Sequence, residues 1–245
     1  MENDPKTCPP IVLQPYCSGA PMAGVPPGCP PDLQFLTTVD QLFIMQKVEL
    51  VEAFTGFETR NKYRVFNSLG QQILFAKEDT DCCTRQCCGA SRPFDLTITD
   101  IQGQEVIHLY RPLRCCLEEL EVSSPPGSVI GRVDQKWSFC PKFVIKDQLG
   151  EPVLRIEGPW CTDSDCCGDV EFRVVDVQTG EQVGLVTKQW SGMAKEVFTD
   201  ADNFGISFPL DLDVKVKATL LGALFLIDYM YYEDPEQTYD YRYRY

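Results

Sequence analysis

Histidine is nearly absent from this chain of 245 residues, which contains His108 and no other. A single imidazole disfavours both histidine-based catalysis and a histidine-rich zinc site. Basic residues are also few: the chain has 22 Lys and Arg and 36 Asp and Glu, which gives a net charge of −14. General nucleic-acid binding needs a basic face that displaces counterions, so this composition excludes it. The same charge is repelled by anionic lipid, so we expect any membrane contact to use apolar insertion, acylation or a bridging cation.

The first residues are acidic and proline-rich and lack the apolar segment of a secretory signal. This favours a reducing compartment, in which the 13 cysteines are free, acylated or metal-bound. Glu2 argues against myristoylation, and the final Arg-Tyr-Arg-Tyr argues against prenylation. A nucleophile–base pair, a phosphate loop and a cofactor fingerprint are all missing from the sequence, so we do not expect a conventional enzyme.

Three regions differ in composition. Residues 1–31 hold nine of the 18 prolines and predict a disordered or polyproline-II tail. Pro27 and Pro30 form a minimal PxxP motif, a weak candidate for binding an SH3-type partner. Residues 32–233 have the composition of a folded domain, and residues 234–245 form a short tail rich in tyrosine and acidic residues.

The folded region contains an internal repeat, with units at 63–107 and 143–184. Each unit reads as a hairpin, a Cys-Cys-Gly loop and a second hairpin, and each hairpin turn ends in glycine, which readily adopts the left-handed conformation. Two units supply about eight strands. Further strands are expected at 41–48, 117–122 and 128–137. We therefore predict a mainly β fold, a pseudo-symmetric antiparallel barrel that closes to remove exposed edges.

Residues 215–232 are the most apolar stretch and predict a helix. Its apolar part begins at Ala218 and is about 22 Å long, against roughly 30 Å of bilayer hydrocarbon, and Asp228 lies within it. Two alternatives stay open: a core helix that plugs the barrel, or a membrane helix with its N-terminal side in the cytosol. The residues of the predicted membrane helix are Lys217, Ala218, Leu220, Leu221, Leu224, Phe225, Leu226, Ile227, Tyr229 and Met230.

Residues 200–211 partly match the calcium loop of an EF-hand. The carboxylates expected at positions 1, 3 and 12 are Asp200, Asp202 and Asp211. Gly205 permits the sharp turn at position 6, but Phe204 replaces an oxygen-bearing side chain at position 5. We expect a weak Ca²⁺ site with a dissociation constant of about 10⁻⁴ to 10⁻³ M. The alternative is an Asp-capped turn whose apolar side chains point into the core, namely Phe204, Ile206 and Phe208.

Cysteines occur in adjacent pairs, and three interpretations compete: acylation near a membrane, a thiolate metal site, and small buried hydrophobic residues. The lipidation candidates are Cys82, Cys83, Cys87, Cys88, Cys115 and Cys116. A thiolate metal site would join the first four to Cys161, Cys166 and Cys167 of the second repeat, although adjacent pairs are not the usual zinc spacing.

Four motifs resemble the phospholipid scramblase family: EDTDCCTRQCCG at 78–89, RPLRC at 111–115, CCGDV at 166–170 and FTDADNFGISFPLDLDVKVKA at 198–218. The similarity runs from Leu33 to Glu233, roughly four-fifths of the chain. It implies a tubby-like barrel of about twelve strands around a C-terminal helix. It also implies calcium-activated, ATP-independent, bidirectional movement of phospholipids. The Ca²⁺ ligands implied by the resemblance are Asp200, Asp202, Phe204, Ile206, Phe208 and Asp211.

This sequence departs from the family in three places. The acylated cysteine-rich run is shortened to Cys115 and Cys116, the nuclear import segment at 184–192 retains only Lys188 as a basic residue, and the proline-rich tail lacks a PPxY motif.

The resemblance places the protein at the plasma membrane, as a single-pass type II or acyl-anchored protein with its barrel in the cytosol. One short helix offers no polar groove for lipid headgroups, so transport would require a homo-oligomer or a disturbed bilayer. The competing hypothesis is a calcium-responsive adaptor at the membrane that does not itself move lipid.

Overall fold

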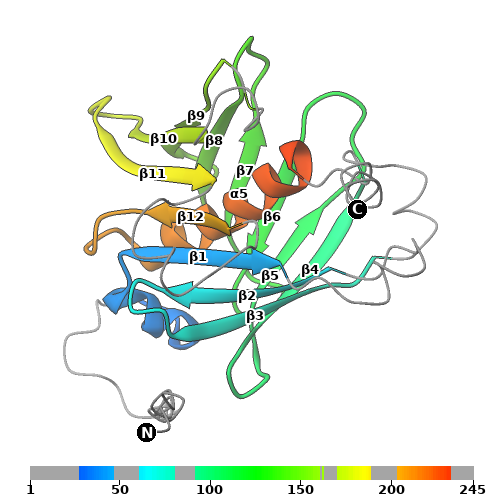
Figure 1. The fold of residues 1–245 in the computed structure, drawn as a ribbon, viewed down its shortest axis with the longest axis vertical. Helices are drawn as coiled ribbons and strands as arrows, with labels where there is room; N and C mark the ends of the chain where they lie inside the picture. Colours follow the sequence, from blue (N-terminus) through cyan, green and yellow to red (C-terminus); the bar gives the residue numbers. More distant parts are fainter. Residues whose placement is uncertain are drawn as a thin grey trace, which may run out of the picture.

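The computed structural model describes residues 28–46, 61–80, 92–160, 162, 170–188 and 203–232. Twelve antiparallel strands form a closed barrel in the order β1-β12-β11-β10-β9-β8-β7-β6-β5-β4-β3-β2, and one α-helix lies inside it (Figure 1). The elements are η1 (Pro31–Thr38), β1 (Gln41–Gln46), β2 (Lys62–Asn67), β3 (Gln72–Glu78), β4 (Phe94–Asp100), β5 (Glu105–Arg111), β6 (Glu119–Ser123), β7 (Val129–Gln135), β8 (Lys142–Asp147), β9 (Pro152–Glu157), β10 (Val170–Asp176), β11 (Gln182–Lys188), β12 (Asn203–Ser207) and α5 (Val214–Tyr231). The predicted mainly β barrel around a C-terminal helix is confirmed.

The hairpin turns of the two repeats share one construction. In the β4–β5 turn, Asp100 Oδ1 accepts hydrogen bonds from the backbone N–H groups of Gln102 and Gln104, each at 2.9 Å. In the β8–β9 turn, Asp147 Oδ1 accepts the equivalent hydrogen bonds from the backbone N–H groups of Leu149 and Glu151. The glycines that close these turns, Gly103 and Gly150, have φ values of 83° and 85°, which side chains with a Cβ rarely adopt. The glycine-ended hairpins predicted from the repeat are therefore present.

Because neighbouring strands are antiparallel, their connections alternate between the two ends of the barrel. One end, called the turn rim, carries the short turns at 68–71, 101–104, 124–128, 148–151 and 177–181. The other end, called the loop rim, carries the longer connections, of which the structure describes 112–118, 136–141 and 158–160. Helix α5 begins at the turn rim, where Lys215 Nζ lies 2.9 Å from Gln148 Oε1, and ends at the loop rim.

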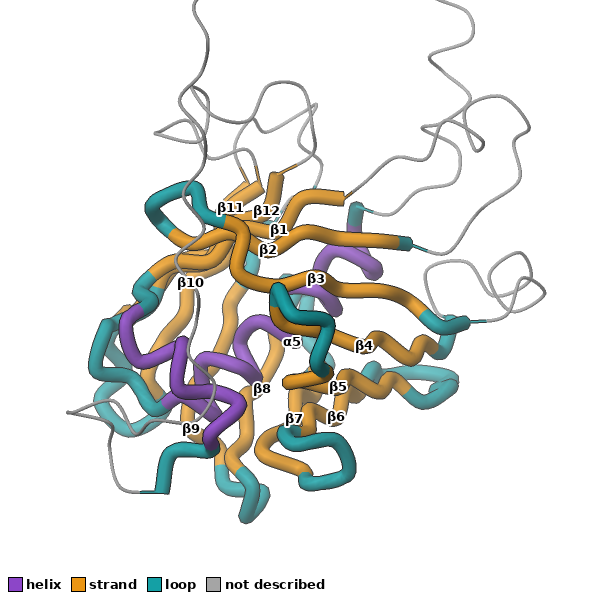
Figure 2. The backbone as a smooth tube through the Cα atoms, turned by 90° about the horizontal axis from the view of Figure 1, so that it is seen from below, coloured by secondary structure: helices purple, strands orange, loops and turns teal. Residues whose placement is uncertain are grey.

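Helix α5 forms the centre of the core. It is apolar on every face, and its residues from Val216 to Tyr229 are all buried. Strands of the barrel surround it (Figure 2). At Gly222 the packing is so close that a Cβ atom would lie 2.9 Å from Val122 Cγ2 on β6. The Phe225 ring meets Tyr63 of β2 edge-on, with ring centroids 5.1 Å apart. Of the two alternatives that the sequence leaves open, the structure adopts the one in which the helix fills the barrel.

Three boundaries differ from the sequence-based expectation. The helix spans Val214–Tyr231 and not 215–232, because Asp213 caps its first turn. Residues 203–207, expected within a calcium loop, form strand β12. The proline-rich tail expected at 1–31 lies outside the described residues up to residue 27, and Pro31 is the first residue of η1.

We expect Leu221→Ala to lower the free energy of unfolding by about 2–5 kcal/mol, because a fully buried side chain inside a closed barrel leaves a cavity. Leu149→Ala is the matched control, since Leu149 is exposed in a turn and its loss should cost less than about 0.5 kcal/mol. Urea unfolding followed by circular dichroism measures both. Equal effects of the two substitutions would contradict a helix packed inside the barrel.

Candidate functional site

The first turn of α5 is fixed by Asp213. Its Oδ1 accepts hydrogen bonds from the backbone N–H groups of Lys215 at 2.8 Å and Val216 at 3.3 Å. These N–H groups have no partner within the helix, so the side chain satisfies them as an N-cap. The run of acidic and apolar residues at 211–214 therefore ends the preceding connection and begins the helix.

One turn further on, the buried ammonium group of Lys217 joins three segments of the chain. Its Nζ donates to the carbonyl oxygens of Leu36 at 2.9 Å, Val39 at 2.8 Å and Leu210 at 2.7 Å. It also lies 5.3 Å from the centroid of the Phe208 ring. These contacts tie η1 and the β12–α5 connection to the helix, and they use all three donors of the ammonium group.

Burial lowers the pKa of Lys217 from its ordinary value, and the nearby carboxylates of Asp211, Asp40 and Asp213 oppose that shift. A buried charge is tolerated when its hydrogen bonds are complete and opposite charges lie near it. The turn rim therefore carries a buried ammonium group near Asp211, one of the predicted Ca²⁺ ligands.

At the other end of α5, a second buried polar group is fully engaged. Tyr229 Oη donates to Glu78 Oε2 at 3.2 Å, and Glu78 Oε1 accepts from Arg92 Nε at the same distance. The Arg92 guanidinium lies 4.8 Å from the centroid of the Tyr229 ring. The barrel thus provides partners for polar side chains near both ends of an otherwise apolar helix.

Of the predicted calcium loop, the structure describes only residues 203–211. Phe204 and Ile206 belong to β12, whose backbone pairs with β1 on one side and β11 on the other. Their side chains and that of Phe208 are buried in the core, as in the alternative interpretation of this segment. Asp211 is exposed at the turn rim, and Asp200 and Asp202 lie outside the described residues.

The described part of the predicted loop begins with an extended strand. The strand begins directly after Asp202 and ends four residues before Asp211. Five extended residues span about 16 Å, whereas Ca²⁺ ligands lie about 2.3–2.6 Å from the ion. Residues 203–211 therefore do not fit an EF-hand loop. Within the part of the chain that the structure describes, no three His, Cys, Asp or Glu side chains are grouped so that they could hold a metal ion.

Two of the predicted lipidation cysteines, Cys115 and Cys116, are exposed on the loop rim. Their Sγ atoms lie 3.5 Å apart; the hydrogen bond that Cys116 donates to Cys115, followed by electrostatic repulsion from Cys115, raises the pKa of Cys116. Both thiols are open to a reagent or an acyltransferase. The other candidates, Cys82, Cys83, Cys87 and Cys88, lie outside the described residues.

The residues of the predicted membrane helix line the barrel interior. All of them are buried except Met230, which is half-buried near the loop rim. Among the helices that the structure describes, none combines the length and the apolar character needed to cross a membrane.

Sequence reasoning missed a cluster of aromatic side chains on the loop rim, which we call the aromatic rim patch: Trp137, Phe139 and Trp160. Residues 128–137 were expected as one strand, but β7 ends at Gln135 and Trp137 leaves the barrel wall. The ring centroids lie 5.7 Å apart for Trp137 and Phe139, and 6.4 Å apart for Phe139 and Trp160. Phe139, two residues before Pro141 in the connection between two predicted strands, was the available signal.

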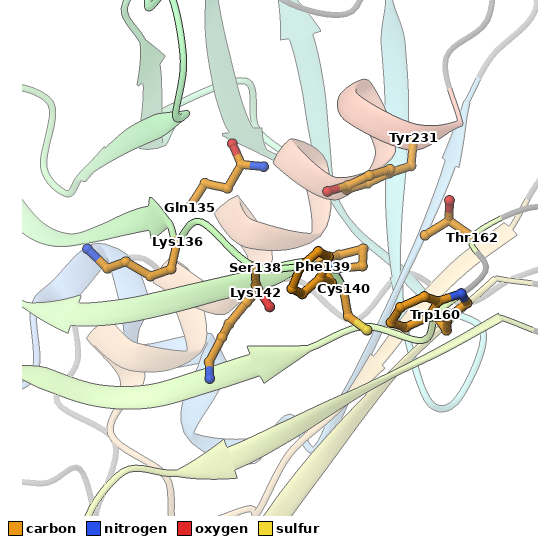
Figure 3. A pocket seen from close by; sticks show the side chains of 10 residues that line it. Gln135, Lys136, Ser138, Phe139, Cys140, Lys142, Trp160, Thr162 and Tyr231 are labelled. Carbon is orange, nitrogen blue, oxygen red and sulfur yellow. The ribbon is translucent and has the colours of Figure 1, made fainter.

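A cavity of about 230 Å³ lies beside the aromatic rim patch (Figure 3). Phe139 and Trp160 line one part of it, and Tyr231, at the end of α5, lines another. In this view the ammonium groups of Lys136 and Lys142 point away from the two rings. The cavity therefore combines aromatic faces with uncharged polar side chains, among them Gln135, Ser138 and Thr162.

The fold and these surfaces define a class of protein: a closed β-barrel that encloses its own C-terminal helix and displays aromatic and cysteine side chains at one rim. The family model described as Scramblase matches residues 20–234. The chain therefore belongs to the phospholipid scramblase family, as the sequence motifs indicated.

Its relatives are close in sequence. The chain is 56% identical over 220 residues to phospholipid scramblase 2 of Bos taurus, covering 86% of this chain and 75% of that protein. It is 55% identical over 216 residues to phospholipid scramblase 1 of Homo sapiens, covering 85% and 68%. A solved structure of a protein from Arabidopsis thaliana aligns with a TM-score of 0.44 and 13% identity, over 78% of this chain and 94% of that one.

We expect Lys217→Met to lower the free energy of unfolding by about 3 kcal/mol, since the carbonyl groups of Leu36, Val39 and Leu210 all lose the ammonium group as a donor. Lys215→Met, two residues away, is the control. Lys215 is only partly buried and contacts Gln148 at the surface, so its replacement should cost less than about 0.5 kcal/mol. Thermal and urea unfolding measure the stability of both variants. Similar stabilities would show that the three carbonyl contacts of Lys217 contribute little.

Proposed function

We propose that this protein is a phospholipid scramblase that moves phospholipids in both directions between bilayer leaflets without ATP. The observation that carries the proposal is the 56% identity to a protein named phospholipid scramblase 2, over 86% of the chain. The name of that relative supports lipid transport rather than the chemistry of a conventional enzyme.

The buried helix limits how lipid could move. Leu220, Leu224 and Ile227 are fully buried among the strands, so the apolar face of α5 is occupied by protein in this conformation. The cavity of about 230 Å³ at the loop rim is smaller than the roughly 300–1,000 Å³ of pockets that enclose a drug-sized ligand. Transport therefore follows from disturbance of the bilayer at the protein surface, by one copy or by several, rather than from passage through the barrel.

The second candidate function is a membrane-associated adaptor without lipid transport. The enclosed position of α5 favours it, because the helix that was expected to reach the bilayer is buried inside the barrel. In that case the barrel surface and the proline-rich tail would bind protein partners. Residues 1–27, which include Pro27 of the PxxP motif, lie outside the described residues.

Purified full-length protein in liposomes should accelerate the loss of fluorescent lipid when a membrane-impermeant reductant is added outside. Loss beyond the outer-leaflet half is expected in the absence of ATP, because lipid from the inner leaflet becomes accessible. Protein-free liposomes are the control. Protein that is bound to the liposomes but leaves this rate unchanged would support the adaptor and contradict the scramblase.

Calcium activation belongs to the proposal as an expectation from the family. Strand β12, about 16 Å of extended chain, lies in the sequence between Asp202 and Asp211, which favours a Ca²⁺ site that does not use Asp211. We expect the Asp200→Asn, Asp202→Asn double variant to lose the calcium response, and Asp211→Asn to keep it within about twofold. Calorimetric titration with Ca²⁺ and the transport assay both report this. If Asp211→Asn abolishes Ca²⁺ binding as completely as the double variant does, the loop has a different conformation when it binds the ion.

The proposal further assigns the protein to the cytosolic face of the plasma membrane. Acylation of Cys115 and Cys116 would supply an anchor there, and their exposure on the loop rim supports it. This placement would direct the loop rim toward the lipid.

A further inference from the structure

The aromatic rim patch is unusual for a surface exposed to water. Trp137, Phe139 and Trp160 are 78%, 82% and 79% exposed, and their rings contact one another rather than the core. Single exposed apolar residues are common, but a contiguous aromatic group at the tip of a fold marks an interaction site. The rings of Phe139 and Trp160 are stacked, with 23° between ring planes.

The chemistry of the patch selects a lipid surface over a charged partner. Tryptophan and phenylalanine partition to the boundary between headgroups and acyl chains, where an apolar ring and a polar N–H are both satisfied. The neighbouring cations are already paired: Lys136 Nζ lies 3.1 Å from Asp134 and Lys142 Nζ lies 3.7 Å from Glu157. With a net charge of −14, the protein gains little from anionic lipid, so apolar insertion is the attachment that this patch can supply.

Other described groups on the same rim fit a lipid surface as well. Leu113 and Leu117 are exposed in the β5–β6 connection and flank Cys115 and Cys116. The β5–β6, β7–β8 and β9–β10 connections follow one another along the loop rim, because their strands are neighbours in the barrel. The opposite turn rim instead carries the Asp-centred turns of Asp100, Asp147 and Asp176.

We propose that the aromatic rim patch inserts into the interfacial layer of a phospholipid bilayer and orients the barrel with its loop rim, and the C-terminal end of α5, toward the lipid. The choice of occupant rests on the proposed function, because it takes phospholipid as the molecule that the protein handles. Insertion reaches about 5–10 Å into the headgroup and acyl boundary, as in other interfacial attachments. Acyl chains on Cys115 and Cys116 would add to this contact, but the patch does not require them.

The test uses acyl-free full-length protein and phosphatidylcholine vesicles in a flotation assay. We expect the Trp137→Ala, Phe139→Ala, Trp160→Ala variant to bind at least about tenfold more weakly than the unmodified chain. The matched control replaces three exposed leucines of the turn rim by alanine, Leu69, Leu149 and Leu210, which are 78%, 79% and 55% exposed. We expect this control to bind normally, and high salt to leave binding of the unmodified protein unchanged because the attachment is apolar. Circular dichroism confirms that both triple variants remain folded.

A second readout locates the patch directly. In a Trp190→Phe background, Trp137 and Trp160 are the remaining tryptophans of the three in the chain. Vesicles containing lipids brominated near the headgroup end of the acyl chain should quench their fluorescence. Vesicle binding without quenching would overturn the proposal, and so would equal binding by the aromatic variant and the leucine control.

The outcome is independent of lipid transport. If the unmodified protein floats through its patch but does not scramble lipid, the docking surface stands and the proposed function fails. If it scrambles and the aromatic variant both scrambles and floats equally well, the docking surface fails and the function stands. If the unmodified protein does not float, and sedimentation shows a dimer that the aromatic variant loses, the patch is a contact between two copies of the chain and the proposal is overturned.

Discussion

A helix that is apolar on every face must be covered on every face, and α5 satisfies this requirement by lying inside a closed barrel. An open sheet would bury only one side of it and would leave two strand edges unpaired. Pairing of β1 with β12 closes the sheet, and Phe204 and Ile206 of β12 then point inward onto the same core as Phe225. The barrel and the helix therefore stabilise each other, because neither has a complete core alone.

The few polar side chains of the helix each depend on specific partners inside the barrel. Transfer of an ammonium group to an apolar interior is costly, so Lys217 is tolerated only because three carbonyl oxygens surround it. Tyr229 is accommodated at the other end by Glu78 and Arg92. These contacts also fix how the helix is rotated and how deeply it lies in the barrel. A helix held in this way presents apolar residues only to protein, which explains why membrane contact must be sought elsewhere on the surface.

Much of this fold could be predicted from local pattern, and the exceptions have physical causes. The hairpins of the repeat were recognisable because glycines such as Gly103 and Gly150 end turns between alternating β-branched residues. Strand order was not, because the pairing of Gln41 with Ser207 joins distant parts of the chain. Strand β12 was missed because its acidic flanks match a calcium loop, although Phe204, Ile206 and Phe208 show the two-residue period of a strand. Trp137 was expected to continue a strand, since aromatic residues favour strands and are usually buried.

The position of α5 in chain order also bears on how the protein is made. It is the last of the described elements, so the ribosome delivers the centre of the core after all twelve strands. Until then the strands have no helix to pack against, and β1 cannot pair with β12 to close the barrel until β12 has been synthesised. Folding dominated by such distant contacts is slow and leaves apolar strands exposed to aggregation. Nascent chains of this protein therefore expose apolar strand surface until synthesis has passed Tyr231, and a truncation before α5 would remove the centre of the fold rather than a terminal appendage.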